Sequence, residues 1–133
     1  MLVIDASAAI DLLLGIQPYA DEVANHLRDH DGDLHAPHLL DAEVGQAFRR
    51  FVLRRELRTD RAHRAIIRLA RLPLNRYPHT PLLPYAFDLL KNLTVYDALY
   101  VTLARALDAP LLTRDQALAR AARRHARIIP LRG

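Results

Sequence analysis

The sequence predicts an α/β fold, a sandwich with a central, mainly parallel sheet flanked by helices. Short apolar runs, typical of buried parallel strands, alternate with longer segments whose apolar residues recur every three to four positions. The 133 residues, of which 51% are hydrophobic, suit a single domain spanning 1–133. The chain has no cysteine, so disulfides and thiolate metal sites are excluded.

The first half of the chain is expected to hold two strands and four helices. The apolar run Leu2-Val3-Ile4 ends at Asp5, and Ser7 is the predicted N-cap of the next helix. Pro37 closes a weaker second strand, and Thr59 is the predicted N-cap of the fourth helix. The predicted segments are strand 2–4, helix 8–14, helix 19–30, strand 34–36, helix 39–55 and helix 59–72.

The second half begins with a connector, because four prolines lie between Pro73 and Pro84. The segment Thr94-Val-Tyr-Asp97 has the pattern of a capping box, which starts a helix. The predicted segments are a short strand at 74–76, helix 84–91, helix 94–107, strand 110–113, helix 116–124 and strand 128–129. In parallel sheets, sites form outside the carboxyl ends of the strands, so the residues that follow strands are the first candidates.

The charge is divided unevenly along the chain. Residues 1–48 carry nine acids and one base, whereas residues 49–76 carry ten arginines and two acids. Arginine binds phosphate oxygens with two parallel hydrogen bonds, so an acidic half beside an Arg-rich segment indicates a metal ion and a polyanion together. The alternative is an Arg-rich helix face that only contacts solvent.

Four acids have positions from which they can converge. Asp5 and Asp115 follow strands, and Glu43 and Asp97 lie within otherwise apolar helix faces. Carboxylates packed together raise one another's pKa unless a cation lies among them, and hard oxygen ligands select Mg²⁺ or Mn²⁺. Beside arginines, such a site indicates phosphodiester hydrolysis. Each acid alone also has a structural explanation, as a helix cap, a solvated residue or a partner of a helix dipole.

Other chemistries lack support in the sequence. Seven histidines are present, but no HExxH or Cys/His pattern accompanies them, and no Gly-x-Ser-x-Gly motif occurs. The N-terminus has no basic region before its apolar run, and no apolar stretch approaches the roughly 20 residues of a membrane span. A cytoplasmic protein is therefore expected.

Several segments together resemble the PIN-domain family, and within it the VapC-type toxins of toxin–antitoxin pairs. The matching segments are Val3-Ile4-Asp5-Ala6-Ser7-Ala8, Glu43-Val44, Asn92 through Ala104 and Ala109 through Asp115. The resemblance implies a PIN-like sandwich and a Mg²⁺- or Mn²⁺-dependent endoribonuclease. It also implies a VapB-like antitoxin that places an apolar helix and an arginine on the protein, and a homodimer. The apolar residues of helices 39–72 favour such partners as well.

The resemblance assigns roles to individual residues. Asp5, Glu43, Asp97 and Asp115 match the family's acidic quartet, and Ser7 and Thr113 match polar positions that support the acids. Asp5, Asp97 and Asp115 are the expected metal ligands, while Glu43 is either a ligand or orients the attacking water. The sequence departs from the family at Gln46, where Asn is common.

RNA binding is expected from the arginines. The Arg-rich segments 49–71 and 114–127, with Arg61, Arg64 and Arg68 foremost, are predicted to bind the RNA backbone. Two alternatives remain at this point. One is a PIN-fold nuclease that acts in RNA processing or on DNA flaps, and the other is a non-catalytic RNA-binding module.

Overall fold

Five parallel strands form one sheet in the computed structural model, which describes residues 1–133. The spatial order is β3-β2-β1-β4-β5, and every neighbouring pair is parallel. The predicted α/β fold with a mainly parallel sheet is thus confirmed. The strands are β1 (Leu2–Ile4), β2 (Leu34–Pro37), β3 (Leu74–Tyr77), β4 (Leu111–Thr113) and β5 (Ile128–Pro130).

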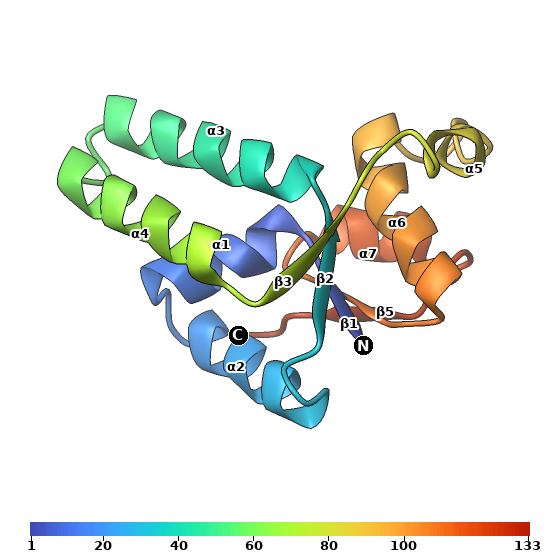
Figure 1. The fold of residues 1–133 in the computed structure, drawn as a ribbon, viewed down its shortest axis with the longest axis horizontal. Helices are drawn as coiled ribbons and strands as arrows, with labels where there is room; N and C mark the ends of the chain where they lie inside the picture. Colours follow the sequence, from blue (N-terminus) through green and yellow to red (C-terminus); the bar gives the residue numbers. More distant parts are fainter.

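Helices cover both faces of this sheet. Figure 1 shows α1 to α4 on one side of the strands and α5, α6 and α7 on the other. The helices are α1 (Ala6–Leu14), α2 (Tyr19–Asp29), α3 (Leu39–Leu53), α4 (Thr59–Arg71), α5 (Leu83–Phe87), α6 (Val95–Leu107) and α7 (Gln116–Ala122). None of them is long and apolar enough to cross a membrane.

Three predicted helix ends are wrong. The N-cap of α1 is Asp5 and not Ser7, since the Asp5 carboxylate accepts a hydrogen bond from the Ala8 backbone N–H at 3.1 Å. Thr59 is the first residue of α4 and not its cap. The helix predicted at 84–91 ends at Phe87, because the chain continues in tight turns whose N–H groups bond three residues back.

The chain changes direction at the centre of the sheet. From β1 it builds outward through β2 to β3, and it then crosses over to place β4 on the other side of β1. The carboxyl ends of β1 and β4 therefore lie side by side, with Ile4 paired to Leu112. In open parallel sheets this is where ligand sites form.

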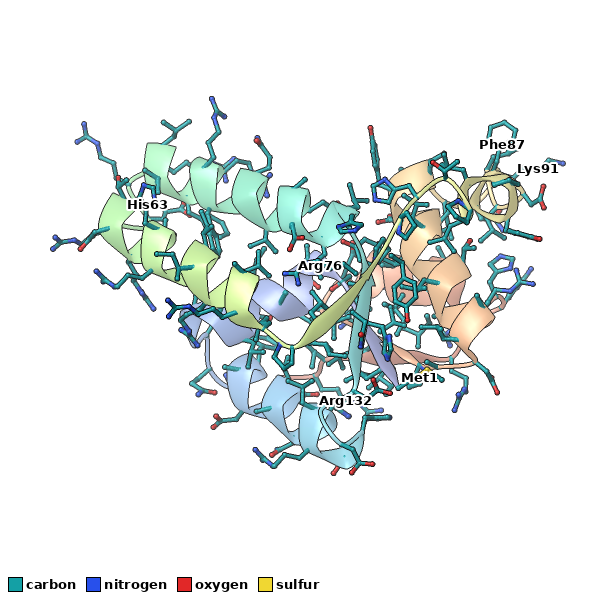
Figure 2. The ribbon with its side chains drawn as sticks, in the orientation of Figure 1. Met1, His63, Arg76, Phe87, Lys91 and Arg132 are labelled. Atoms are coloured by element: carbon teal, nitrogen blue, oxygen red, sulfur yellow. The ribbon has the colours of Figure 1, made fainter.

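The core lies between the sheet and its helices. Leu2, Val3 and Ile4 are fully buried, and α6 is buried along most of its length. On the opposite face, Arg76 at the end of β3 donates two hydrogen bonds to the Asp41 carboxylate, at 2.7 and 3.1 Å. This pair fixes the first turn of α3 against the sheet, near the middle of the view in Figure 2.

Phe48 on α3 tests this packing. Its side chain is almost completely buried, whereas Leu53 on the same helix is 64% exposed. We expect Phe48→Ala to lower the free energy of unfolding by about 3–5 kcal/mol, because it leaves a cavity in the core. The control Leu53→Ala should change it by less than about 0.5 kcal/mol. Urea unfolding measures both, and equal losses would contradict the described packing of α3.

Candidate active site

The four acids singled out in the sequence line one cavity at the carboxyl ends of β1 and β4. The cavity has a volume of about 380 Å³. Asp5 comes from the end of β1, Glu43 from α3, Asp97 from the first turn of α6 and Asp115 from the residue before α7. The remaining lining residues are Ala6, Ser7, Ile10, Gln46, Ala47, Arg50 and Tyr100.

The Asp5 carboxylate is buried and surrounded by hydrogen-bond donors. Ser7 donates its hydroxyl to Oδ1 at 2.6 Å, the Ala8 N–H donates to the same oxygen, and the Thr113 hydroxyl donates to Oδ2. Burial nevertheless raises the pKa of Asp5 to about 6, and the hydrogen bonds from Ser7 and Thr113 oppose that rise. Asp5 is therefore an oriented carboxylate that binds a proton more readily than an ordinary aspartate.

The two predicted supporting residues also fix the loop that carries Asp115. Ser7 Oγ accepts a hydrogen bond from the Arg114 backbone N–H at 2.9 Å, and Thr113 Oγ1 accepts one from the Asp115 N–H at 2.9 Å. Both hydroxyls thus join Asp5 to the segment after β4. Each hydroxyl therefore donates a hydrogen bond to the Asp5 carboxylate and accepts one from a backbone N–H of the segment that carries Asp115.

Asp97 and Asp115 each begin a helix as well as lining the cavity. The Asp97 N–H bonds to the Thr94 hydroxyl, and the Asp115 carboxylate accepts from the Leu118 N–H at 3.0 Å as the N-cap of α7. Burial raises the pKa of Asp97, and the charges of Asp115 and Glu43 raise it further. Both acids therefore lie at a helix start, as the structural explanation expects, and both also line the cavity.

Tyr100 is a site residue that the sequence reasoning missed. Its hydroxyl donates to Glu43 Oε1 at 2.6 Å and so links α6 to α3. Burial and the adjacent Glu43 carboxylate raise the pKa of Tyr100 above its usual value, which keeps this hydroxyl protonated and a donor. The available signal was its spacing, since Tyr100 lies three residues after Asp97 on the same side of a helix. Gln46 also lines the cavity, one turn after Glu43.

The three arginines named foremost for RNA binding all contact the protein itself. Arg61 and Arg68 donate to the backbone carbonyls of Leu14 and Leu13 at the end of α1, at 2.7 and 2.8 Å. Arg64 forms an ion pair with Asp60 one turn earlier on α4, at 3.3 Å. These three arginines line a separate depression beside α1, away from the acids. Their role in RNA binding stays a prediction.

Arg114 is anchored in the fold between two site residues. It forms a 2.8 Å ion pair with Asp11, which is buried, and its guanidinium lies 3.8 Å from the centre of the Tyr19 ring. Burial raises the pKa of Asp11, and the Arg114 guanidinium opposes the rise. These contacts of Arg114 hold the segment Thr113–Asp115 against α1 and α2.

The donor set fits a hard divalent cation. The cavity offers four carboxylates and the Ser7 hydroxyl, all oxygen ligands, and neither cysteine nor histidine lines it. No three Asp, Glu or His side chains are close enough to hold an ion between them unaided. Mg²⁺ characteristically keeps several waters and takes only one or two carboxylates directly, so acids spread around a roomy cavity suit it.

Comparison with known proteins agrees with the fold. The PIN-domain family model matches residues 2–124, and the chain belongs to that family. Ribonuclease VapC1 of Mycobacterium tuberculosis is 49% identical over 120 residues, which cover 90% of this chain and 89% of that protein. VapC ribonuclease Mb0985 of Mycobacterium bovis is 39% identical over 115 residues, 86% of each chain. The chain is thus a PIN-domain protein of the VapC type, as its motifs indicated.

The fold is also found in solved structures. The crystal structure of VapBC2 from Rickettsia felis, bound to a DNA fragment from their promoter, contains a chain that aligns with a TM-score of 0.69. The alignment covers 98% of both chains at 11% sequence identity. The PIN-like α/β architecture is therefore shared even where the sequences have diverged.

The raised pKa of Asp5 makes the stability of the metal-free protein depend on pH. Because the folded state holds this pKa near 6 rather than 3.8, folding favours the protonated acid, and stability falls as pH rises from about 4 to about 6. Asp5→Asn stays neutral and can still cap α1. We expect it to exceed the metal-free wild type by about 1–3 kcal/mol at pH 7.5, with the gain shrinking towards pH 4.

Thermal unfolding in EDTA across this pH range measures the effect. Asp29→Asn, which changes an acid away from the cavity at the end of α2, is the control and should follow the wild type. A lower stability of Asp5→Asn at pH 7.5 would contradict the burial cost assigned to Asp5.

Proposed function

We propose that this protein is a metal-dependent endoribonuclease, the toxin of a type II toxin–antitoxin pair, which hydrolyses RNA phosphodiester bonds. The observation that carries the proposal is the convergence of Asp5, Glu43, Asp97 and Asp115 on one cavity at the switch point of a parallel sheet. The VapC ribonucleases to which the chain is 49% and 39% identical support the assignment of RNA as substrate. The cytoplasm, where RNA is abundant, is the proposed location.

The residues have separable roles in this proposal. Asp5, Asp97 and Asp115 hold Mg²⁺ or Mn²⁺, directly or through water. The ion, when bound, acidifies a water and offsets the charge that develops on the phosphate. Ser7 and Thr113 hold the Asp5 carboxylate in one orientation. The Tyr100 hydroxyl occupies one oxygen of Glu43, so its other oxygen serves as a ligand or orients the attacking water.

The arginine faces of 49–71 and 114–127 are proposed to bind the RNA backbone. Arg61 and Arg68 each spend a donor on a carbonyl of α1. A guanidinium has five N–H donors, so each keeps donors for phosphate and is already held in place. With Arg64 they form a fixed basic surface on α4, suited to a sequence-independent contact.

Two exposed apolar surfaces support the proposed protein partners. One lies on α3 and α4, where Leu53, Ile66 and Ile67 are exposed beside an apolar groove of about 240 Å³. The other lies on and just after α5 and includes Tyr85, Phe87 and Leu90; Figure 2 shows Phe87 pointing away from the body of the protein. Patches of this kind mark protein interfaces. The proposed occupants of these two surfaces are a VapB-like antitoxin with an apolar helix and an arginine, and a second copy of the chain.

Metal-dependent cleavage is the test of the catalytic proposal. We expect cleavage of RNA with Mg²⁺ or Mn²⁺, none in EDTA, and a loss of at least about a hundredfold in Asp5→Asn, which keeps the shape of the side chain but removes its charge. A gel assay of RNA fragments measures this, and Asp29→Asn serves as the matched control. Full activity in Asp5→Asn with an unchanged circular dichroism spectrum would overturn the site. RNA binding by the wild type without cleavage, even with Mn²⁺, would favour a non-catalytic module.

The proposed homodimer has its own test. Light scattering at micromolar concentration should give twice the 15.1 kDa mass of the chain. Two double variants identify the interface, namely Ile66→Asp with Ile67→Asp on α4, and Phe87→Asp with Leu90→Asp at α5. We expect one pair to yield monomers and the other to leave the dimer intact. A strict monomer in the wild type would refute the dimer.

A further inference from the structure

Arg50 is the only basic side chain that lines the acid cavity. It belongs to a stripe of α3 that also includes Glu43, Gln46 and Ala47, all of which line the cavity. The spacing of three, four and seven residues places these positions on one face of a helix. Arg50 is therefore part of the same wall as Glu43, about two turns further along.

Arg50 is also uncommitted, unlike the other arginines discussed above. Arg114 is held by Asp11 and Tyr19, and Arg61 by a carbonyl of α1. The Arg50 side chain is exposed and takes part in none of the ion pairs or hydrogen bonds of the structure. An arginine that shares a cavity with four carboxylates and pairs with none of them is positioned at the rim, not among the acids.

The direction of side chains on a helix indicates where the Arg50 guanidinium lies. Cα–Cβ bonds in an α-helix tilt towards its N-terminus, so the Arg50 side chain leans over Gln46 and Ala47 towards the end of α3 that carries Glu43. The rise of about 1.5 Å per residue sets the backbone of Arg50 roughly 10 Å from that of Glu43. A guanidinium at the end of its long stem covers part of this distance and faces whatever crosses the α3 side of the cavity.

A phosphodiester entering this cavity meets an electrostatic obstacle. Four carboxylates repel the negative phosphate, and a cation among the acids offsets that repulsion only at the reacting group. The phosphates on either side of the reacting one remain close to the same acids. A guanidinium at the rim binds one of them with two parallel charge-assisted hydrogen bonds and fixes its direction as well as its distance.

We propose that Arg50 binds a backbone phosphate of the RNA strand at the α3 rim of the cavity and so sets the position of the strand relative to Asp5, Asp97 and Asp115. The inference rests on the proposed ribonuclease function and adds to it a substrate contact within the site. It also separates two kinds of arginine: those of α4 lie outside the cavity, whereas Arg50 acts where the strand passes the acids.

The test measures RNA binding without cleavage. In the Asp5→Asn background, the affinity for a fluorescently labelled single-stranded RNA of mixed sequence is followed by anisotropy. We expect Arg50→Gln to weaken binding at least about tenfold and to reduce the salt slope of log K by about 0.7, the value for one phosphate contact on a single strand. Arg50→Lys keeps the charge but not the fork, so it should restore only part of the affinity.

Arg105→Gln is the matched control, because Arg105 on α6 is also exposed, carries the same charge, lies outside the segments proposed to bind RNA and does not line the cavity. It should weaken binding less than threefold. Mn²⁺ affinity, measured by calorimetry on the Arg50→Gln variant of the otherwise unchanged protein, should not fall. Because Arg50→Gln is expected to lower RNA affinity and not Mn²⁺ affinity, its kcat/KM for RNA cleavage should fall by a factor similar to the loss of RNA affinity.

Three outcomes would overturn the proposal. They are an RNA affinity unchanged by Arg50→Gln, an equal loss in Arg105→Gln, and tighter Mn²⁺ binding with unaltered RNA affinity, which would make Arg50 only a counter-charge to the acids. The binding test also gives its answer whether or not the protein proves to be a ribonuclease. RNA binding that depends on Arg50 in a protein that never cleaves would reject the catalytic function and keep the contact.

Discussion

The Asp5 carboxylate is the point on which the rest of the structure depends. Asp5 follows the central strand and caps the first helix. Its carboxylate accepts hydrogen bonds from the Ser7 hydroxyl on α1 and from the Thr113 hydroxyl at the end of β4. A buried charge is costly unless donors surround it, so the chain near it is arranged to supply them. Ser7 lies two residues on, and Thr113 lies on the adjacent strand. Both hydroxyls also accept hydrogen bonds from the backbone N–H groups of Arg114 and Asp115. The groups that stabilise the Asp5 carboxylate therefore also fix the position of Asp115.

Much of this architecture could be predicted from the sequence for physical reasons. Apolar runs predicted the central strands β1 and β4, and the rule that parallel sheets bind ligands at their carboxyl ends pointed to Asp5 and Asp115. Helix ends were less predictable where two residues compete for one role. Asp5 and Ser7 can both cap α1, and only the three-dimensional structure shows that the Ser7 hydroxyl is engaged by Asp5 and by Arg114 instead.

Contacts between distant segments were beyond the reach of the sequence. The bond from Tyr100 to Glu43 joins residues 57 positions apart, and nothing local marks it. Likewise, composition reports how many arginines a segment has but not which carbonyls they meet. Arg61 and Arg68 satisfy the last turn of α1, where helix carbonyls have no partner within the helix. These arginines therefore stabilise the fold. A count of charges in the sequence cannot distinguish this role from the binding of a polyanion.

The pairing of β1 with β4 has a mechanical consequence. The two strands are aligned through only two residue pairs, Val3 with Leu111 and Ile4 with Leu112. Glu43 follows β2 on one side of this junction, and Asp115 follows β4 on the other. Repulsion between the acids opposes the pairing of the two halves of the sheet, and a cation held between the acids would offset that repulsion. A ligand that binds the folded cavity and not the unfolded chain would therefore stabilise the fold by an amount that grows with the ratio of its concentration to its Kd.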